Sequence, residues 1–172
     1  LEPFSYTYDK RLYARLGAVS FNRIVTGSFR SLTAEILEHV AAESRDAADT
    51  VIKTVVLHNL LHNYAQNHVL RYYGRQTEKP SFLADMAKQL TELMQSGAEP
   101  EQLLQASADI ADSEHLLADK LFDISRIYAD YLAELDARGL HDALRDPVTA
   151  AAAADASSYL EHSVIFMDEF ES

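Results

Sequence analysis

The sequence predicts a mainly α-helical fold in which a helical block lies between two short strands of a parallel sheet. First, the 172 residues are 48% hydrophobic and 24% charged, which suits one domain with a buried core. Second, the five glycines and four prolines fall between stretches of apolar residues at helical spacing. Third, β-rich segments occur near both ends, at residues 18–26 and 163–167.

The first β-rich segment, residues 18–26, contains β-branched and aromatic side chains and ends at Gly27, so we expect a short strand. A helix should then begin near Ser31, because Ala34 and Glu35 follow it and apolar residues recur at helical spacing. The polar run at residues 43–46 should end this helix.

Further helices follow from apolar stripes with Gly or Pro at their ends. The clearest has its apolar face between Leu116 and Leu135 and is capped by Gly139. The alanine-rich stretch favours a helix because alanine has the lowest helical cost. The expected helices span residues 51–74, 80–97, 113–138 and 150–156, and a further short helix begins at residues 99–101.

The second β-rich segment, Ser163–Met167, is a continuous apolar run without helical period, typical of a strand buried on both faces. A helical block between two strands is what an insertion into a parallel sheet would look like. We therefore expect a strand-bearing N-terminal segment (1–30), a helical insertion domain (31–162) and a C-terminal strand with an acidic pair (163–172).

The composition of the chain excludes several classes of function. A net charge of −12 argues against a generic module that grips a phosphate backbone. The absence of Cys excludes a disulfide framework and a thiolate metal site within these residues. No apolar run approaches the roughly 20 residues that span a bilayer, so we expect a cytoplasmic protein without membrane contact. Because the chain does not begin with Met, we expect it to be part of a longer protein.

Asp168 and Glu169 directly follow the second predicted strand. Ligands of open α/β sheets bind outside the carboxyl ends of the strands. In nucleotide-driven motors, the first such carboxylate holds the Mg²⁺ of the nucleotide and the second orients the attacking water. Asp168 is thus a candidate cofactor and metal ligand and Glu169 a candidate catalytic base. The alternative is a solvated turn.

Three segments resemble one group of proteins. Val164–Phe170 resembles the Walker-B-type motif of superfamily 1 helicases. Ile24–Leu32 resembles the strand and Ser/Thr-Phe element that touches single-stranded DNA in UvrD-like helicases. Lys120–Tyr131 resembles the K-L-x-D-I-x-x-I-Y-x-x-Y stretch of AddB/RexB subunits of bacterial ATP-dependent helicase–nucleases. The resemblance covers roughly residues 18–172.

The resemblance implies a piece of the first motor-like domain, with a RecA-like sheet, of a subunit that processes double-strand breaks for recombinational repair. It implies ATP and Mg²⁺ in the longer protein, single-stranded DNA as a ligand and a second subunit similar to AddA or RexA. Phe29 and Arg30 would contact DNA, although the family's basic residue usually lies one position later. The family often has Gly in place of Glu169. Without a G-x-x-x-x-G-K-[ST] loop, these 172 residues should be inactive alone.

Two other clusters allow a functional and a structural interpretation. His58 and His62 share a helix face, but no third metal ligand is evident, so an exposed face is favoured. Tyr72 and Tyr73, flanked by Arg71 and Arg75, could contact DNA. The tyrosines at 64, 72, 73, 128 and 131 could form a base-stacking platform, but core packing is favoured at such helical positions.

An acidic stretch supports a second hypothesis for the function. It is interpreted as a solvated face or as a docking surface for a basic partner. The alternative function is accordingly a stand-alone acidic helical module for protein–protein interaction. The acidic residues are Asp109, Asp112, Glu114 and Asp119.

Overall fold

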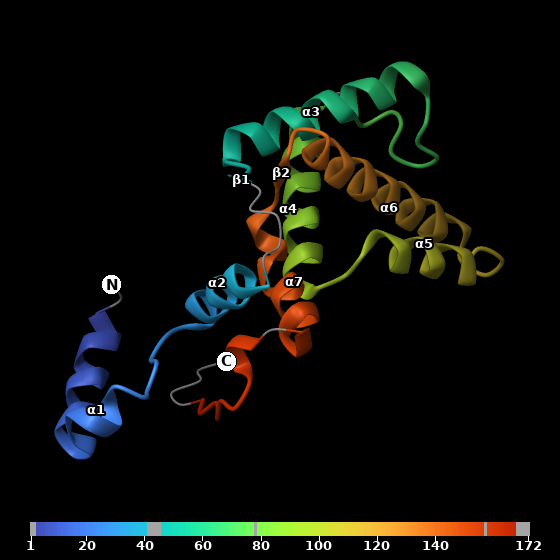
Figure 1. Cartoon of the computed structure of the whole chain (residues 1–172). Helices are drawn as coiled ribbons and strands as arrows, with labels where there is room; N and C mark the ends of the chain where they lie inside the picture. Colours follow the sequence, from blue (N-terminus) through green and yellow to red (C-terminus); the bar gives the residue numbers. More distant parts are fainter. Residues whose placement is uncertain (1–2, 41–45, 78, 157, 168–172) are drawn as a thin grey trace. The chain divides into compact units, whose positions relative to one another are not determined.

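The computed structural model describes residues 3–40, 46–77, 79–156 and 158–167 (Figure 1). The chain divides into two compact units. The central unit comprises residues 43–148, and the terminal unit comprises residues 1–42 together with 149–172. Among the helices of the described ranges, none is long and apolar enough to cross a membrane.

The central unit is built around one long helix, α6. Its buried side chains recur at helical spacing, which confirms the sequence-based helix and the part of its apolar face from Ile124 to Leu135. Leu116 and Leu117, expected on the same face, are exposed. Helix α5 lies alongside α6, and α3 packs against α6 and α4 (Figure 1). The bounds are α3 (Thr50–Asn67), α4 (Pro80–Ser96), α5 (Pro100–Asp109), α6 (His115–Asp136) and the 3₁₀ helix η1 (Ala143–Arg145).

The apolar core lies within the central unit and joins α3, α4 and α6. Ile127 and Tyr128 are completely buried, and Leu61 and Leu135 are 1% exposed. Such burial is the main source of stability for helices that would be marginal alone. The core residues are Ala48, Val56, Leu57, Leu60, Leu61, Tyr64, Leu70, Phe82, Met86, Leu90, Met94, Ile124, Ile127, Tyr128, Tyr131 and Leu135.

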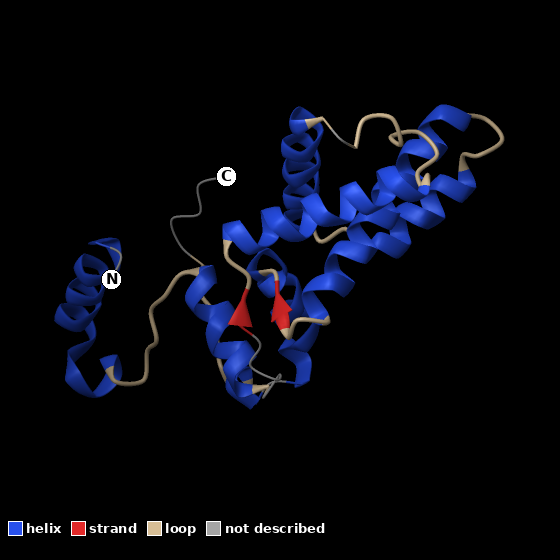
Figure 2. Cartoon of the chain, turned by 90° about the horizontal axis from the view of Figure 1, so that it is seen from above, coloured by secondary structure: helices blue, strands red, loops and turns tan. Residues whose placement is uncertain are grey.

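The central unit also contains two short parallel strands, β1 (Asp46–Ala47) and β2 (Leu140–His141), which the sequence did not predict (Figure 2). Asp46 lies opposite Leu140, and the Ala48 N–H donates to the His141 carbonyl at 2.9 Å. Two residues per strand carry no readable alternation, so only the tertiary contact reveals them.

The terminal unit contains α1 (Pro3–Phe21), interrupted at Gly17 with φ of +74°, and α2 (Phe29–His39). Near the other end lie α7 (Asp146–Ala153), which begins in the central unit, and the 3₁₀ helices η2 (Ala154–Ala156) and η3 (Ser158–Leu160). Helix α2 contacts η3, where the rings of His39 and Tyr159 lie 4.7 Å apart.

Both predicted terminal strands are wrong. The first falls partly in α1 and then in an extended stretch where Val25 is 79% exposed. The second, residues 163–167, has no regular structure and its side chains are exposed, with Phe166 at 89%. A strand needs a hydrogen-bonded neighbour, and β-rich composition alone does not supply one. The expected RecA-like sheet is therefore not formed by the residues that the structure describes.

Helix boundaries agree best where glycine or proline marks them. Helix α4 starts at Pro80 and ends before Gly97, whose φ is +73°, as expected. Helix α3, expected to reach Gly74, ends at Asn67 because His68 adopts a left-handed conformation, with φ of 51°. Helix α2 begins before Ser31, because the Ser28 hydroxyl accepts from the Ser31 N–H at 3.3 Å and caps it.

Candidate nucleic-acid interface

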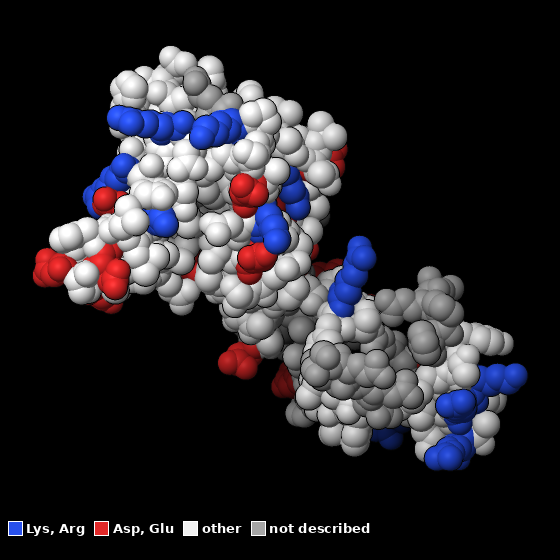
Figure 3. Space-filling view, turned by 180° about the vertical axis from the view of Figure 1, so that it is seen from behind, with Lys and Arg blue, Asp and Glu red and all other residues white. Residues whose placement is uncertain are grey.

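The net charge of the chain is negative, but its N-terminal segment is basic. Residues 1–30 contain five Lys or Arg and two Asp or Glu, whereas residues 31–172 contain ten and 25. In Figure 3, basic and acidic side chains are interspersed over the central unit, while the α1 end shows basic side chains on this face. The objection that net charge raises against a nucleic-acid role therefore does not apply to this segment.

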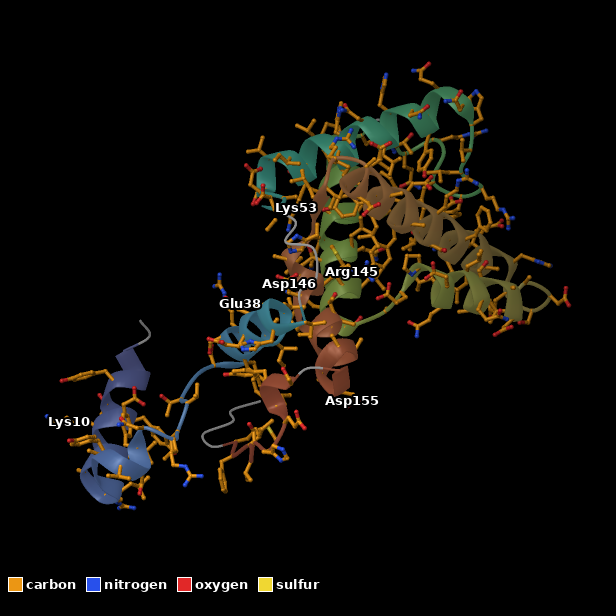
Figure 4. All side chains as sticks on the ribbon, viewed as in Figure 1. Lys10, Glu38, Lys53, Arg145, Asp146 and Asp155 are labelled. Carbon is orange, nitrogen blue, oxygen red and sulfur yellow. The ribbon has the colours of Figure 1, made fainter. Side chains whose placement is uncertain are left out.

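Helix α1 alternates aromatic and basic residues along its faces. Tyr6, Lys10 and Tyr13 follow each other by four and three residues, so they share one face. Tyr6 is 72% exposed and Tyr13 is 52% exposed, and Lys10 projects from the helix (Figure 4). A cation between two accessible rings is a suitable arrangement for binding phosphate and base together.

A second face of α1 repeats this alternation with Tyr8, Arg11 and Arg15, spaced by three and four residues and all exposed. The signal was present in the sequence as Tyr-x-x-Arg-x-x-x-Arg spacing. It was not predicted, because the β-rich composition of residues 18–26 pointed to a strand and the helical spacing before it was not considered.

A hydrogen bond folds the segment after α1 back onto the helix. The Thr26 hydroxyl donates to the carboxylate of Asp9, and the rings of Tyr13 and Phe21 meet edge to face at 5.6 Å. Asp9 is the one acidic side chain among described residues 6–30. The contact thus brings the region before α2 towards the basic helix.

The predicted DNA-contact residues Phe29 and Arg30 lie in the first turn of α2, next to its N-cap Ser28. Both side chains are exposed, Phe29 by 60%. Together with α1 they complete a basic–aromatic segment, defined here as residues 6–30. The other predicted site residues, Asp168 and Glu169, lie outside the described residues, so the structure does not place the acidic pair.

A second basic–aromatic cluster, in the loop between α3 and α4, is organised by Asp123 of α6. This carboxylate is fully buried and accepts the backbone N–H groups of Arg71, Tyr72 and Tyr73 at 2.8, 2.7 and 2.9 Å. Three amide donors compensate the loss of water around the charge. This role of Asp123 was not predicted from the sequence, although an Asp within the apolar stripe of a predicted helix is a signal of a buried carboxylate.

Cation–π contacts connect this loop cluster to α6. The Arg71 guanidinium lies 3.4 Å from the centroid of the Phe122 ring and 3.6 Å from an oxygen of Asp119. The Lys120 ammonium lies 4.7 Å from the centroid of Tyr72. These contacts stabilise the loop against α6, so the structure favours a packing role for this cluster.

The tyrosines at positions 64, 128 and 131 belong to the core, as expected. Burial is the first cause that raises the pKa of each phenol. The Tyr64 hydroxyl also donates to Asp130, and the Tyr131 hydroxyl donates to Asp142 at 2.8 Å. Phenols held in this way are unavailable for base stacking.

Asp142 joins three elements of the central unit. It is 2% exposed and accepts from the Lys53 ammonium of α3 at 2.6 Å, from Tyr131 of α6 and from the Leu144 N–H at 3.0 Å. Figure 4 labels Lys53 on α3. Asp142 therefore fixes the turn after β2, which is a structural role.

His58 and His62 lie on the exposed face of α3 with parallel rings whose centroids are 6.4 Å apart. No group of three or more His, Cys, Asp or Glu that could hold a metal ion occurs in the part of the chain that the structure describes. The geometry supplies no metal centre on which to base a function.

The chain matches the family described as "ADDB, N-terminal" from residue 2 to residue 172. It belongs to this family. A protein of Pelotomaculum thermopropionicum, named as a subunit of an ATP-dependent helicase/deoxyribonuclease, is 31% identical over 137 residues, which cover 77% of this chain and 12% of that protein. A protein of Clostridium acetobutylicum with the same name is 25% identical over 171 residues, covering 99% of this chain and 14% of that protein.

This result confirms the resemblance to AddB subunits, and the structure explains the motif that carried it. Within Lys120–Tyr131, Asp123 organises the loop after α3, and Tyr128 and Tyr131 pack in the core. In this AddB N-terminal chain, these three residues of the motif therefore maintain the helical fold. The chain spans about one-eighth of the length of these relatives.

Proposed function

We propose that this chain is the N-terminal part of a helicase–nuclease subunit, in which it guides single-stranded DNA during processing of double-strand breaks for recombinational repair. Membership of the AddB N-terminal family supports this assignment. The observation that carries it is the basic–aromatic segment, whose five cations and exposed rings are concentrated in 25 residues of an acidic chain. Family membership also favours this role over a stand-alone module.

Each residue type in the segment suits one part of a nucleic-acid strand. Lys10, Arg11 and Arg15 would neutralise phosphates, with Arg30 adding a further cation beside α2. Exposed Tyr rings and Phe29 would stack on bases, which requires no particular sequence because every base has a flat face. The segment is therefore suited to a moving strand, not to fixed sequence recognition.

In the longer protein, the proposal includes ATP-driven movement with a second subunit similar to AddA or RexA. Asp168 would hold Mg²⁺ of the nucleotide and Glu169 would orient and activate water. The apolar run before them is exposed in this chain, with Val164 at 76% and Phe166 at 89%, and would be covered by another part of the longer protein. ATP hydrolysis by a Glu169→Gln variant of the longer protein tests this step.

The DNA-contact proposal is tested on the 172-residue chain with fluorescein-labelled oligo(dT) of about 15 nucleotides, a length within the site sizes of single-strand binding proteins. Affinity is measured by anisotropy across a salt series. We expect Lys10→Gln/Arg11→Gln/Arg15→Gln to weaken binding by about tenfold or more, and to flatten the log–log salt dependence by about 2, since each lost contact removes about 0.7. Phe29→Ala should weaken binding with little change in that slope, because stacking is not ionic.

The matched control is Lys79→Gln/Lys88→Gln/Arg138→Gln, which removes three exposed cations from the central unit. It should change affinity by less than about twofold, because these cations lie outside the proposed interface. Equal losses in both triple variants would mean that only overall charge matters, and would reject the N-terminal segment as the interface.

A further inference from the structure

A groove lies between α5 and α6 of the central unit and encloses about 490 Å³. Its apolar and small lining residues include Leu104, Ala108, Ala111, Ala118 and Phe122. Glu101, Gln105, His115, Asp119 and Arg71 contribute polar groups to the same lining. The groove therefore combines an apolar lining with two carboxylates, of which Asp119 lies near Arg71 and Glu101 does not have a cationic partner among the described residues.

Three leucine side chains in and near this groove are exposed to solvent. Leu104 is 47% exposed, and Leu116 and Leu117 at the start of α6 are 60% and 47% exposed. The sequence placed Leu116 and Leu117 on the apolar face that the rest of α6 buries. The apolar stripe of α6 thus continues beyond the core to a surface that described residues leave uncovered, as interaction surfaces do.

The part of the hairpin formed by α5 and the start of α6 is acidic, whereas Lys120 and Arg126 lie further along α6. Residues 99–119 contain six Asp or Glu and no Lys or Arg. Glu99 pairs with Arg145 at 2.6 Å, and Asp119 lies near Arg71. The remaining four have no cationic partner within the described part of the chain; they are Glu101, Asp109, Asp112 and Glu114.

We propose that the α5–α6 groove binds a basic amphipathic helix of a partner protein. Leucine-type side chains of that helix would fill the groove beside Leu104, and its Lys or Arg side chains would meet the acidic groups of the hairpin. Nucleic acid is disfavoured here because residues 99–119 offer no Lys or Arg for a phosphate, and Arg71 of the lining already lies 3.6 Å from Asp119. The inference does not depend on DNA binding by the terminal unit, since it involves residues of the central unit alone.

The test uses a defined probe, a labelled peptide of Lys and Leu, about 18 residues long, with the leucines at helical spacing, titrated with the 172-residue chain. A control peptide has the same composition with the order shuffled to remove the apolar face. We expect the helical peptide to bind about tenfold more tightly, because only it can place leucines in the groove while lysines face the acidic groups. Equal affinity would reduce the interaction to bulk charge attraction and overturn the proposal.

Two variants locate the binding site. Glu101→Gln/Glu114→Gln should weaken peptide binding by about fivefold, and the matched pair Asp85→Asn/Glu92→Gln on α4 by less than about twofold. Leu104→Ser should weaken binding by about tenfold. Because these side chains are exposed, folding is checked by circular dichroism, and the charge pair decides the matter if Leu104→Ser unfolds. Equal effects of the two charge pairs would reject the groove as the site.

Discussion

Single buried carboxylates organise the central unit at the residue scale. Asp123 holds three successive N–H groups of the loop after α3, and Asp142 holds an ammonium, a phenol and an N–H after β2. Both are nearly inaccessible to solvent. Asp123 thus provides the acceptors for three buried backbone N–H groups, whereas Asp142 joins two side-chain donors and one backbone N–H.

Asp123→Ala should lower the free energy of unfolding by about 3 kcal/mol or more, because three buried N–H groups lose their acceptor at once. Urea unfolding measures this change. Asp119→Asn, one turn away and 44% exposed, is the control and should cost less than about 0.5 kcal/mol. A loss below about 1 kcal/mol for Asp123→Ala would mean that the loop is held mainly by its side chains.

Stability should fall at alkaline pH. Burial, then hydrogen bonding to a carboxylate, raises the pKa of Tyr64 and Tyr131 above the ordinary value of 10.0. The stabilisation is complete below about pH 10 and is lost as the pH rises towards the folded-state pKa, because the unfolded phenol then ionises first. The expected slope is about 1.4 kcal/mol per pH unit for each phenol.

Urea unfolding between about pH 9 and pH 11.5 measures this slope, since the window brackets the ordinary phenol pKa. Tyr131→Phe should reduce the slope of the free energy of unfolding against pH by the contribution of one phenol. Tyr64→Phe/Tyr131→Phe should reduce it by the contribution of two. An unchanged slope in the double variant would attribute the alkaline loss to other groups.

At the scale of elements, α5 is held at its start by a side-chain pair. Both Glu99 carboxylate oxygens accept from Arg145 of η1 at 2.6 Å, and the Glu99 N–H donates to Gln102 at 2.9 Å. The pair connects residues 46 positions apart in the sequence. The pair with Arg145 connects the start of α5 to the end of η1, and the contact with Gln102 caps the first turn of α5.

Glu99→Ala should therefore lower the free energy of unfolding by about 1 kcal/mol, which chemical denaturation can measure. The control is Glu92→Ala on α4, whose partner Lys88 lies 3.8 Å away across an exposed helix face. That change should cost less than about 0.5 kcal/mol. Similar losses in the two variants would show that the pair with Arg145 adds nothing beyond a surface contact.

Elements that depend on local sequence signals were predicted correctly, and elements that depend on contacts between distant residues were not. The helices of the central unit were predictable because proline, glycine and helical apolar spacing act locally, as at Pro80 and Gly97. The early end of α3 was not, because Asp123, 50 residues beyond Tyr73, holds the loop after it. The terminal strands failed because strand pairing depends on a neighbour outside the local sequence.

At the scale of the whole molecule, the central unit should fold without the terminal unit. Every member of its apolar core lies between Ala48 and Leu135. A protein of residues 43–148 should therefore unfold in one cooperative urea transition. It should also lose the oligonucleotide binding proposed for the basic–aromatic segment. A non-cooperative transition would show that the terminal unit completes the core.

The sequence alone determined the mainly helical class, the α6 motif and membership of the AddB N-terminal family, because these depend on local spacing and residue order. It also contained the basic N-terminal charge, which segment-by-segment counting reveals. Only the tertiary structure determined the roles of Asp123 and Asp142, the pairing of β1 with β2 and the α5–α6 groove. Each of these depends on residues distant in sequence, whose contacts arise from burial and hydrogen bonding in three dimensions.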